Sequence, residues 1–201
     1  MSQQTAVPRP EPLDRLLRAA EAALEASAPP RSPERAAVDR VFGRVRARTG
    51  HIDMAAPKTL PVVAHLPAAL DATGGGARVA VAEALREIAP SLGWARRSSA
   101  SAEDATFWNG HANAMILGPG AIEERDDLWI GVTLMAPHVS YAEHSHPPEE
   151  VYLRLAPGEW WNARMDWTDP GETSLIYNPP GIQHAMRSGD TPFLALWFLP
   201  L

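Results

Sequence analysis

The stretch Tyr141–Tyr152, which reads YAEHSHPPEEVY, decides the fold of this chain. Its two histidines, His144 and His146, are two residues apart, so on an extended strand their side chains point to the same face. The proline pair that follows cannot sit inside a hydrogen-bonded ladder, so the chain must turn there. Glu150 and Tyr152 then begin the returning strand, again on one face. Such a turn brings together two imidazoles, a carboxylate and a phenol, which are the groups that a divalent metal site needs.

A further imidazole comes from the segment NPPGIQHAM, residues 178–186. Its Pro-Pro-Gly run predicts a turn, and His184 follows where a new strand would begin. We therefore predict that His144, His146, Glu150 and His184 bind one divalent transition metal ion. Nitrogen ligands with one carboxylate suit zinc or iron, and also manganese, cobalt or nickel. The alternatives are a surface cluster and a pocket that binds its ligand without a metal.

The composition excludes several classes of protein. The chain has 201 residues, enough for one core-bearing domain with an appendage. It has no cysteine, so disulfides and thiolate metal sites are excluded. Its net charge of −6 argues against nucleic acid or an anionic membrane surface as a partner. The first residues lack the apolar core of a signal peptide and no run is long enough to span a membrane, so we expect a soluble cytoplasmic protein.

Residues 1–92 are predicted to form a helical region. Its apolar residues recur at helical spacing, and prolines and glycines separate the helices. We expect this region to cover the second half of the chain as a packing layer, with a homodimer contact as the alternative, and to contribute no catalytic side chain. Residues 1–10 are polar and are predicted to be disordered. Helices are predicted over 11–26, from an N-cap at Ser32 to near Gly50, over 61–70 and over 77–89.

Residues 93–201 contain short apolar runs separated by turn residues, a pattern typical of an all-β barrel or sandwich. A barrel encloses a cavity in which rigid strands would position the metal ligands. The predicted fold class is therefore α+β, a C-terminal antiparallel β-barrel that forms the catalytic domain under an N-terminal helical layer. The predicted strands are 95–98, 113–117, 129–135, 140–145, 150–155, 158–165, 173–177, 184–187 and 193–199.

Two tyrosines flank the histidines. Tyr152 shares the face of Glu150, so we expect it to point at the metal. Tyr141 lies three residues before His144, so it reaches the same pocket only if the strand contains a bulge or a bend. A phenol has a pKa near 10 in water, and a divalent cation close by favours the phenolate, which is a usable general base. Core packing with a satisfied hydroxyl is the alternative for both residues.

The pattern HxHxxxE followed by PxGxxH is similar to the two-part signature of the cupins. His144–Glu150 match the first part and Pro179–His184 match the second. The resemblance implies a small antiparallel β-barrel whose metal is held by three histidines and one glutamate. The chain departs from the pattern at His138, where cupins usually have glycine, and at Ser188, where they usually have asparagine.

The wider pattern YxxHxHxxxExY, with tryptophan-rich strands and a helical first half, resembles the cupin-type dimethylsulfoniopropionate lyases, the DddQ group in particular. The resemblance implies a metal-assisted β-elimination that splits dimethylsulfoniopropionate into acrylate and dimethyl sulfide. Tyr152 would then be the general base, and Tyr141 would orient the substrate or act as an alternative base. A cationic sulfonium favours aromatic walls, for which Trp129 and Trp197 are candidates, with core packing as their alternative.

Two other functions use the same ligand set. A cupin dioxygenase would oxidise a small molecule with iron, and a non-enzymatic cupin would sense a ligand. Under the lyase hypothesis the partner is a small zwitterionic substrate. No partner is expected among nucleic acids or membranes.

Overall fold

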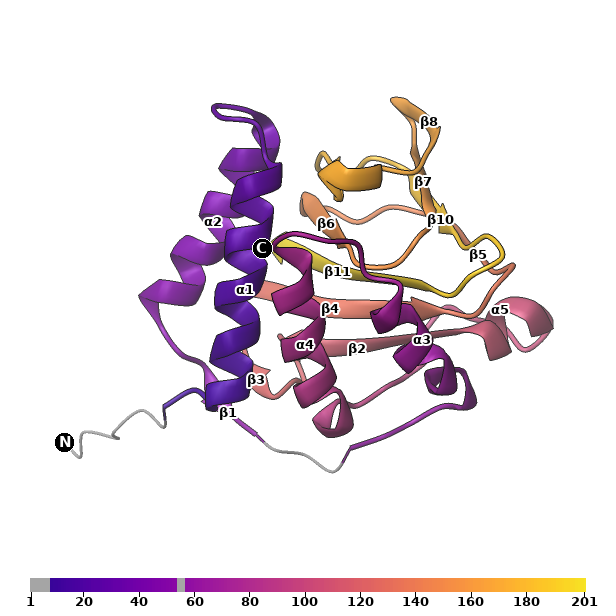
Figure 1. Ribbon diagram of the computed structural model, residues 1–201, viewed down its shortest axis with the longest axis horizontal. Helices are drawn as coiled ribbons and strands as arrows, with labels where there is room; N and C mark the ends of the chain where they lie inside the picture. The colour runs from indigo at the N-terminus through magenta and orange to yellow at the C-terminus, as the bar shows by residue number, and fades with distance from the viewer. Residues whose placement is uncertain (1–7, 54–56) are drawn as a thin grey trace.

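Helices and two sheets form three layers in this α+β protein, a computed structural model that describes residues 8–53 and 57–201 (Figure 1). The helices of the first half lie against one face of a large sheet, and a smaller sheet lies beyond the opposite face. This β-sandwich under a helical layer fits the predicted cupin fold class. Among the helices that the structure describes, none combines the length and the apolar character that a bilayer crossing requires.

The first half contains the main helices. Helix α1 begins after Pro10, and its buried leucines recur at the spacing that the sequence predicts. Ser32 caps α2, because its Oγ accepts a hydrogen bond from Arg35 N at 3.1 Å, and Pro33 fills the first turn. The predicted helix over 61–70 is a 3₁₀ turn, Pro61–His65, that continues into α3. The helices are α1 (Glu11–Ser27), α2 (Pro33–Ala47), α3 (Leu66–Asp71), α4 (Arg78–Ile88) and α5 (Ala105–Gly110).

The strands that the structure describes form a seven-stranded sheet of order β1-β3-β2-β4-β11-β6-β9 and a four-stranded sheet of order β5-β10-β7-β8. Every pairing is antiparallel except that of β2 with β3. The strands are β1 (His51–Ile52), β2 (His111–Leu117), β3 (Glu123–Glu124), β4 (Leu128–Met135), β5 (Ser140–His144), β6 (Glu150–Arg154), β7 (Glu159–Asn162), β8 (Met165–Thr168), β9 (Leu175–Asn178), β10 (His184–Arg187) and β11 (Phe193–Pro200).

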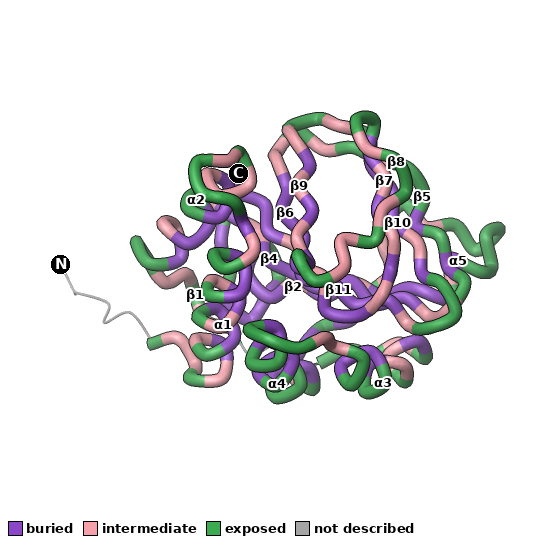
Figure 2. Tube along the Cα trace, turned by 45° about the horizontal axis from the view of Figure 1, so that its top comes forward, coloured by how far each residue is buried: buried purple, intermediate pink, exposed green. Residues whose placement is uncertain are grey.

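Successive side chains along the strands of the large sheet point to opposite faces, so the sheet separates two hydrophobic cores. On β4, Val132 and Leu134 belong to the core shared with the helices, whereas Trp129 and Thr133 face the small sheet. Figure 2 shows that β2, β4, β6 and β11 are the most buried strands, while the helices alternate between buried and exposed residues. The helical layer therefore covers one face of the sheet and leaves the other face free to build a site.

Three sequence predictions need correction. Residues 95–98 form no strand, because only Ala95 bridges to Asn113 there. The predicted strand 158–165 ends early, because β7 stops at Asn162 and the chain turns before β8 begins at Met165. Of the predicted disordered residues 1–10, the first seven lie outside the described residues, but Arg9 is ordered and pairs with the fully buried Glu123 at 2.5 Å.

Candidate functional site

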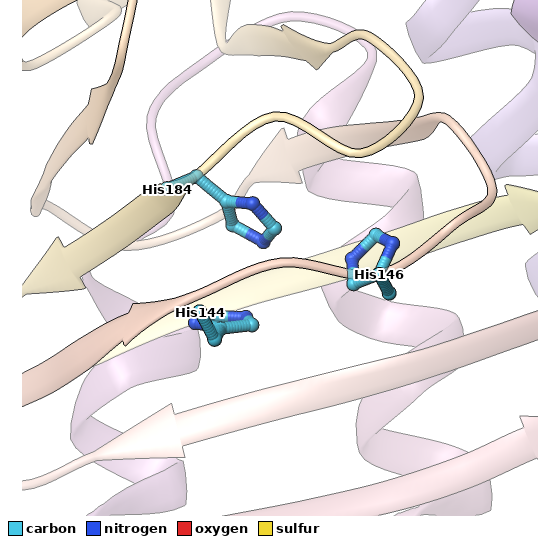
Figure 3. Close-up of side chains that lie close together, drawn as sticks. All are labelled: His144, His146 and His184. Atoms are coloured by element: carbon cyan, nitrogen blue, oxygen red, sulfur yellow. The ribbon is translucent and has the colours of Figure 1, made fainter.

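Three histidines converge between the two sheets (Figure 3). His144 ends β5, His146 lies in the loop that follows, and His184 begins β10. One ring nitrogen from each residue lies within 4.8 Å of the other two. Antiparallel pairing of β5 with β10 places His144 directly opposite His184, and the turn at the proline pair Pro147-Pro148 brings His146 to the same point.

Backbone carbonyls fix the tautomer of all three imidazoles. The Nδ1 atoms of His144, His146 and His184 lie 2.9, 2.9 and 3.0 Å from the carbonyl oxygens of Ala142, Pro148 and Ile182. Because a carbonyl only accepts, each Nδ1 carries the proton and donates. In the neutral imidazole each Nε2 then carries a lone pair, and this is the form in which histidine binds a metal.

Glu150 completes the group from the start of β6. Its Oε2 lies 3.3 Å from His146 Nε2 and 3.2 Å from His184 Nε2. His184 Nε2 is buried without a hydrogen-bond partner of good geometry. Lone pairs on two imidazoles that face a carboxylate leave a place that only a proton or a cation can satisfy. This donor set fits a divalent transition metal ion.

The electrostatics of the histidines differ. Burial and the neighbouring His184 lower the pKa of His144 to about 4, so this imidazole is neutral and free to bind a cation. Burial also opposes charge on His146, but its hydrogen bond to Glu150 and the charge of that carboxylate raise its pKa above the ordinary value. Burial alone would raise the pKa of Glu150, but the imidazoles of His146 and His184, 3.3 and 3.2 Å from its Oε2, lower it to about 2.

A cavity of about 180 Å³ opens beside the histidines. Trp129 and Trp197, the predicted substrate-binding residues, both line it, and so do both tyrosines. The lining also includes residues that sequence analysis did not select. These are Arg97, Asn113, Thr133, Met186 and Leu199.

Tyr141 reaches the cavity because β5 contains a bulge. His184 pairs with His144 and Met186 pairs with Tyr141, so β5 uses three residues where β10 uses two. This irregularity is the bulge or bend that the spacing of Tyr141 from His144 requires. The Tyr141 hydroxyl accepts a hydrogen bond from Asn113 Nδ2 at 3.1 Å.

Both phenols are buried, and burial is the main reason that their pKa values are raised. The Glu150 carboxylate raises the pKa of Tyr152 further. The Arg97 guanidinium, 5.3 Å from the centre of the Tyr141 ring, works in the opposite direction on the pKa of Tyr141. Neither phenol is a base unless positive charge is added nearby.

Of the residues that sequence analysis missed, two could have been identified from the pattern of their strands. Asn113 and Thr133 are polar residues with apolar neighbours on both sides, and Thr133 has the same parity as Trp129. Arg97 had no such pattern, since it precedes α5 in a loop. The buried His111 holds that loop, because its Nε2 accepts a hydrogen bond from Arg97 N at 2.9 Å.

The two residues that depart from the cupin pattern, His138 and Ser188, both fit the local backbone. His138 has φ of 60°, the left-handed conformation that favours the usual glycine, and its side chain is exposed. Ser188 is buried, where it accepts from Val139 N at 2.9 Å and contacts Ala136 O at 2.7 Å. The turn before β5 thus keeps its hydrogen bonds without the usual residues.

Three histidines and a glutamate gathered between the sheets of an α+β sandwich define a cupin with a candidate metal site. Residues 33–195 match the model of the dimethylsulfoniopropionate lyase family, and the chain belongs to that family. It is 30% identical over 151 residues to the dimethylsulfoniopropionate lyase DddQ of Ruegeria pomeroyi, covering 72% of this chain and 74% of DddQ.

Two further comparisons agree with this assignment. The chain is 35% identical over 135 residues to DddL of Cereibacter sphaeroides, itself a candidate dimethylsulfoniopropionate lyase. The match covers 67% of this chain but only 56% of DddL, so this chain spans little more than half of that relative. The crystal structure of DddQ from Ruegeria pomeroyi superposes with a TM-score of 0.72 and 24% identity, over 96% of this chain and 93% of DddQ, and so has the same fold.

Proposed function

We propose that this protein is a metal-dependent lyase that cleaves dimethylsulfoniopropionate into acrylate and dimethyl sulfide. Family membership supports the substrate. The observation that carries the chemistry is one cavity lined by two imidazoles, a buried carboxylate and two phenols, with a third imidazole, that of His184, grouped with the other two within 4.8 Å. A cavity of about 180 Å³ suits a small zwitterion.

His144, His146, His184 and Glu150 would hold the metal ion, for which zinc or iron are the first candidates and manganese, cobalt or nickel the others. When bound, such an ion supplies Lewis-acid chemistry that acidifies the hydrogen next to a carboxylate and favours a phenolate nearby. The buried Glu150 keeps its negative charge for this purpose, since its pKa is about 2.

Tyr152 is the proposed general base. Its oxygen takes the substrate's α-hydrogen as a proton, the electrons of that C–H bond form the new carbon–carbon double bond, and the carbon–sulfur bond breaks. The electron pair of the broken bond leaves on sulfur. The sulfonium therefore departs as neutral dimethyl sulfide and requires no acid catalyst. Because burial and Glu150 raise the pKa of Tyr152, its phenolate depends on positive charge at the histidine site.

The cavity wall suits both ends of a zwitterion. Trp129 and Trp197 line the cavity, and an indole face attracts a sulfonium by up to about 2 kcal/mol when water is excluded. Arg97 adds a positive charge that complements the substrate carboxylate. Tyr141, whose ring lies beside Arg97, is placed to orient that carboxylate.

The test is release of dimethyl sulfide into the headspace when metal-loaded protein is mixed with dimethylsulfoniopropionate without oxygen. Equal rates with and without oxygen are expected of a lyase, whereas a dioxygenase would require oxygen. No dimethyl sulfide from protein with confirmed metal would reject the lyase proposal and favour a ligand-sensing cupin.

A further inference from the structure

A continuous row of hydrogen bonds crosses the cavity wall and ends on Tyr141. Asn113, Thr133 and Trp197 supply it from the adjacent strands β2, β4 and β11. Asn113 lies directly opposite Thr133 in the β2–β4 register, and Trp197 lies opposite Gly131, one same-face position from Thr133. The contacts are Trp197 Nε1 to Thr133 Oγ1 at 3.2 Å, Thr133 Oγ1 to Asn113 Oδ1 at 2.7 Å and Asn113 Nδ2 to Tyr141 OH at 3.1 Å.

The orientation of the Asn113 amide sets the direction of the bonds in this row, because its carbonyl oxygen faces Thr133 and its nitrogen faces Tyr141. The Trp197 indole N–H is a donor without acceptor capacity, so the Thr133 oxygen accepts from it. The Asn113 carbonyl oxygen faces Thr133, so the Thr133 hydroxyl donates its own proton to Asn113. The amide nitrogen of Asn113 is then the atom that faces Tyr141, and the Tyr141 oxygen accepts.

The direction of the row determines where the Tyr141 hydroxyl proton points. With one position on its oxygen occupied by the Asn113 N–H, the phenol cannot donate back along the row. Its proton is left to point into the cavity, where His144 and Arg97 also lie. Without this partner, the hydroxyl proton could occupy either of its two positions in the plane of the ring.

A glycine keeps the far end of the row in place. A Cβ on Gly131 would lie 2.1 Å from Trp197 Cζ2 and 2.7 Å from the carbonyl oxygen of Ala114. The indole therefore lies across β4 at a point where no other residue type leaves room. The row thus depends on the register of β2, β4 and β11, on the close approach of the Trp197 indole to Gly131, and on three polar side chains.

We propose that Asn113 is a positioning residue, held by Thr133 and Trp197, which makes Tyr141 a fixed hydrogen-bond donor toward the substrate carboxylate. This inference rests on the proposed lyase function and deepens it. Asn113 lines the cavity, but in this scheme it acts through the Tyr141 oxygen.

A double-mutant cycle tests the proposal. Asn113→Leu is expected to lower kcat/KM for dimethyl sulfide release about tenfold, the size expected for one lost hydrogen bond. In a Tyr141→Phe background the same change is expected to have less than about a twofold effect, because its target is gone. Equal effects in both backgrounds would overturn the inference.

Two substitutions of Thr133, to valine and to serine, form a matched pair that differs in the hydroxyl and changes the cavity volume little. Thr133→Val removes the hydroxyl and is expected to lower kcat/KM several-fold, whereas Thr133→Ser keeps the hydroxyl and restores the rate. This pair retains a test if Asn113→Leu fails to fold. Loss of activity in both variants, or in neither, would contradict the proposal.

A measurement independent of activity separates this inference from the proposed function. In ¹⁵N-labelled protein, Tyr141→Phe is expected to shift one side-chain amide proton of Asn113 upfield and speed its exchange with water. If neither the chemical shift nor the exchange rate of the Asn113 amide proton changes in Tyr141→Phe, the inference is overturned, whatever the substrate is. A wild-type protein that shows the shift but releases no dimethyl sulfide would reject the lyase proposal alone.

Discussion

At the scale of single residues, the site depends on which nitrogen of each histidine is free. The Nδ1–H groups of His144, His146 and His184 each donate to a backbone carbonyl, which leaves the three Nε2 atoms to bind a cation. Two of them also face Glu150. Removing a single imidazole should therefore open the coordination shell.

We expect His146→Ala and His184→Ala each to lose bound metal, because the remaining donors no longer surround the ion. Elemental analysis of the purified variants measures this directly. His138→Asn is the matched control, since His138 is exposed and asparagine tolerates its positive φ. Full metal content in both alanine variants would contradict the site.

The Tyr152 hydroxyl is expected to be needed for chemistry but not for the fold. Tyr152→Phe should keep the metal and the melting temperature and lower kcat by about 10² or more, the usual contribution of a general base. Headspace dimethyl sulfide and elemental analysis on the same sample check both parts. Near-complete activity would show that another group is the base.

At the scale of elements, the helical layer supports the site without entering it. Arg40 of α2 binds the Glu149 carboxylate with two nitrogens, at 2.7 and 2.8 Å, and the Tyr177 hydroxyl donates to the same group at 2.9 Å. Glu149 directly precedes Glu150. Helix α2 therefore braces the turn that carries His146, which gives the packing layer a part in the geometry of the site.

Replacing either of two glycines by alanine is expected to change the stability of the protein, in opposite directions. Gly131→Ala should destabilise the protein and displace Trp197, because its Cβ would meet the indole and the carbonyl oxygen of Ala114. Gly43→Ala should stabilise it by up to about 1 kcal/mol, since Gly43 lies inside α2 with open space around its Cβ position. Thermal denaturation of the two variants gives the comparison. A shift of the same sign in both would contradict this account.

At the scale of the whole molecule, a buried ion network ties the first half of the chain to the large sheet. Arg125 binds both oxygens of Asp127 at 2.8 Å and donates to the carbonyl oxygens of Arg44 and Arg48, which lie at the end of α2. Glu123, fully buried, accepts from both Arg9 and Arg125. These contacts join residues far apart in the sequence.

This network predicts a pH dependence of stability. Hydrogen bonds from Arg125 lower the pKa of Asp127 to about 2 from its ordinary value of 3.8. A carboxyl whose pKa is depressed in the folded state contributes stability above its unfolded pKa, and that contribution is lost as the pH falls toward about 2. Asp127→Asn should therefore lower the melting temperature at neutral pH, with the difference from wild type shrinking below about pH 4. A constant difference down to acid pH would contradict the network.

The sequence alone determined the periodic features of this protein. Apolar spacing predicted the main helices, and a period of two placed His144, Glu150 and Tyr152 toward one cavity. The cupin spacing located His184 as well. The helix and strand inferences need only neighbours along the chain, because periodicity is a local property, whereas the cupin spacing rests on a family resemblance.

The tertiary structure decided the features that depend on how distant segments align. The hydrogen-bond row from Trp197 to Tyr141 requires the register of three strands, and the bulge that admits Tyr141 appears only in the pairing of β5 with β10. Arg97 enters the cavity because His111 holds its loop. No local pattern encodes these contacts, since each is a distance between residues that only the folded chain brings together.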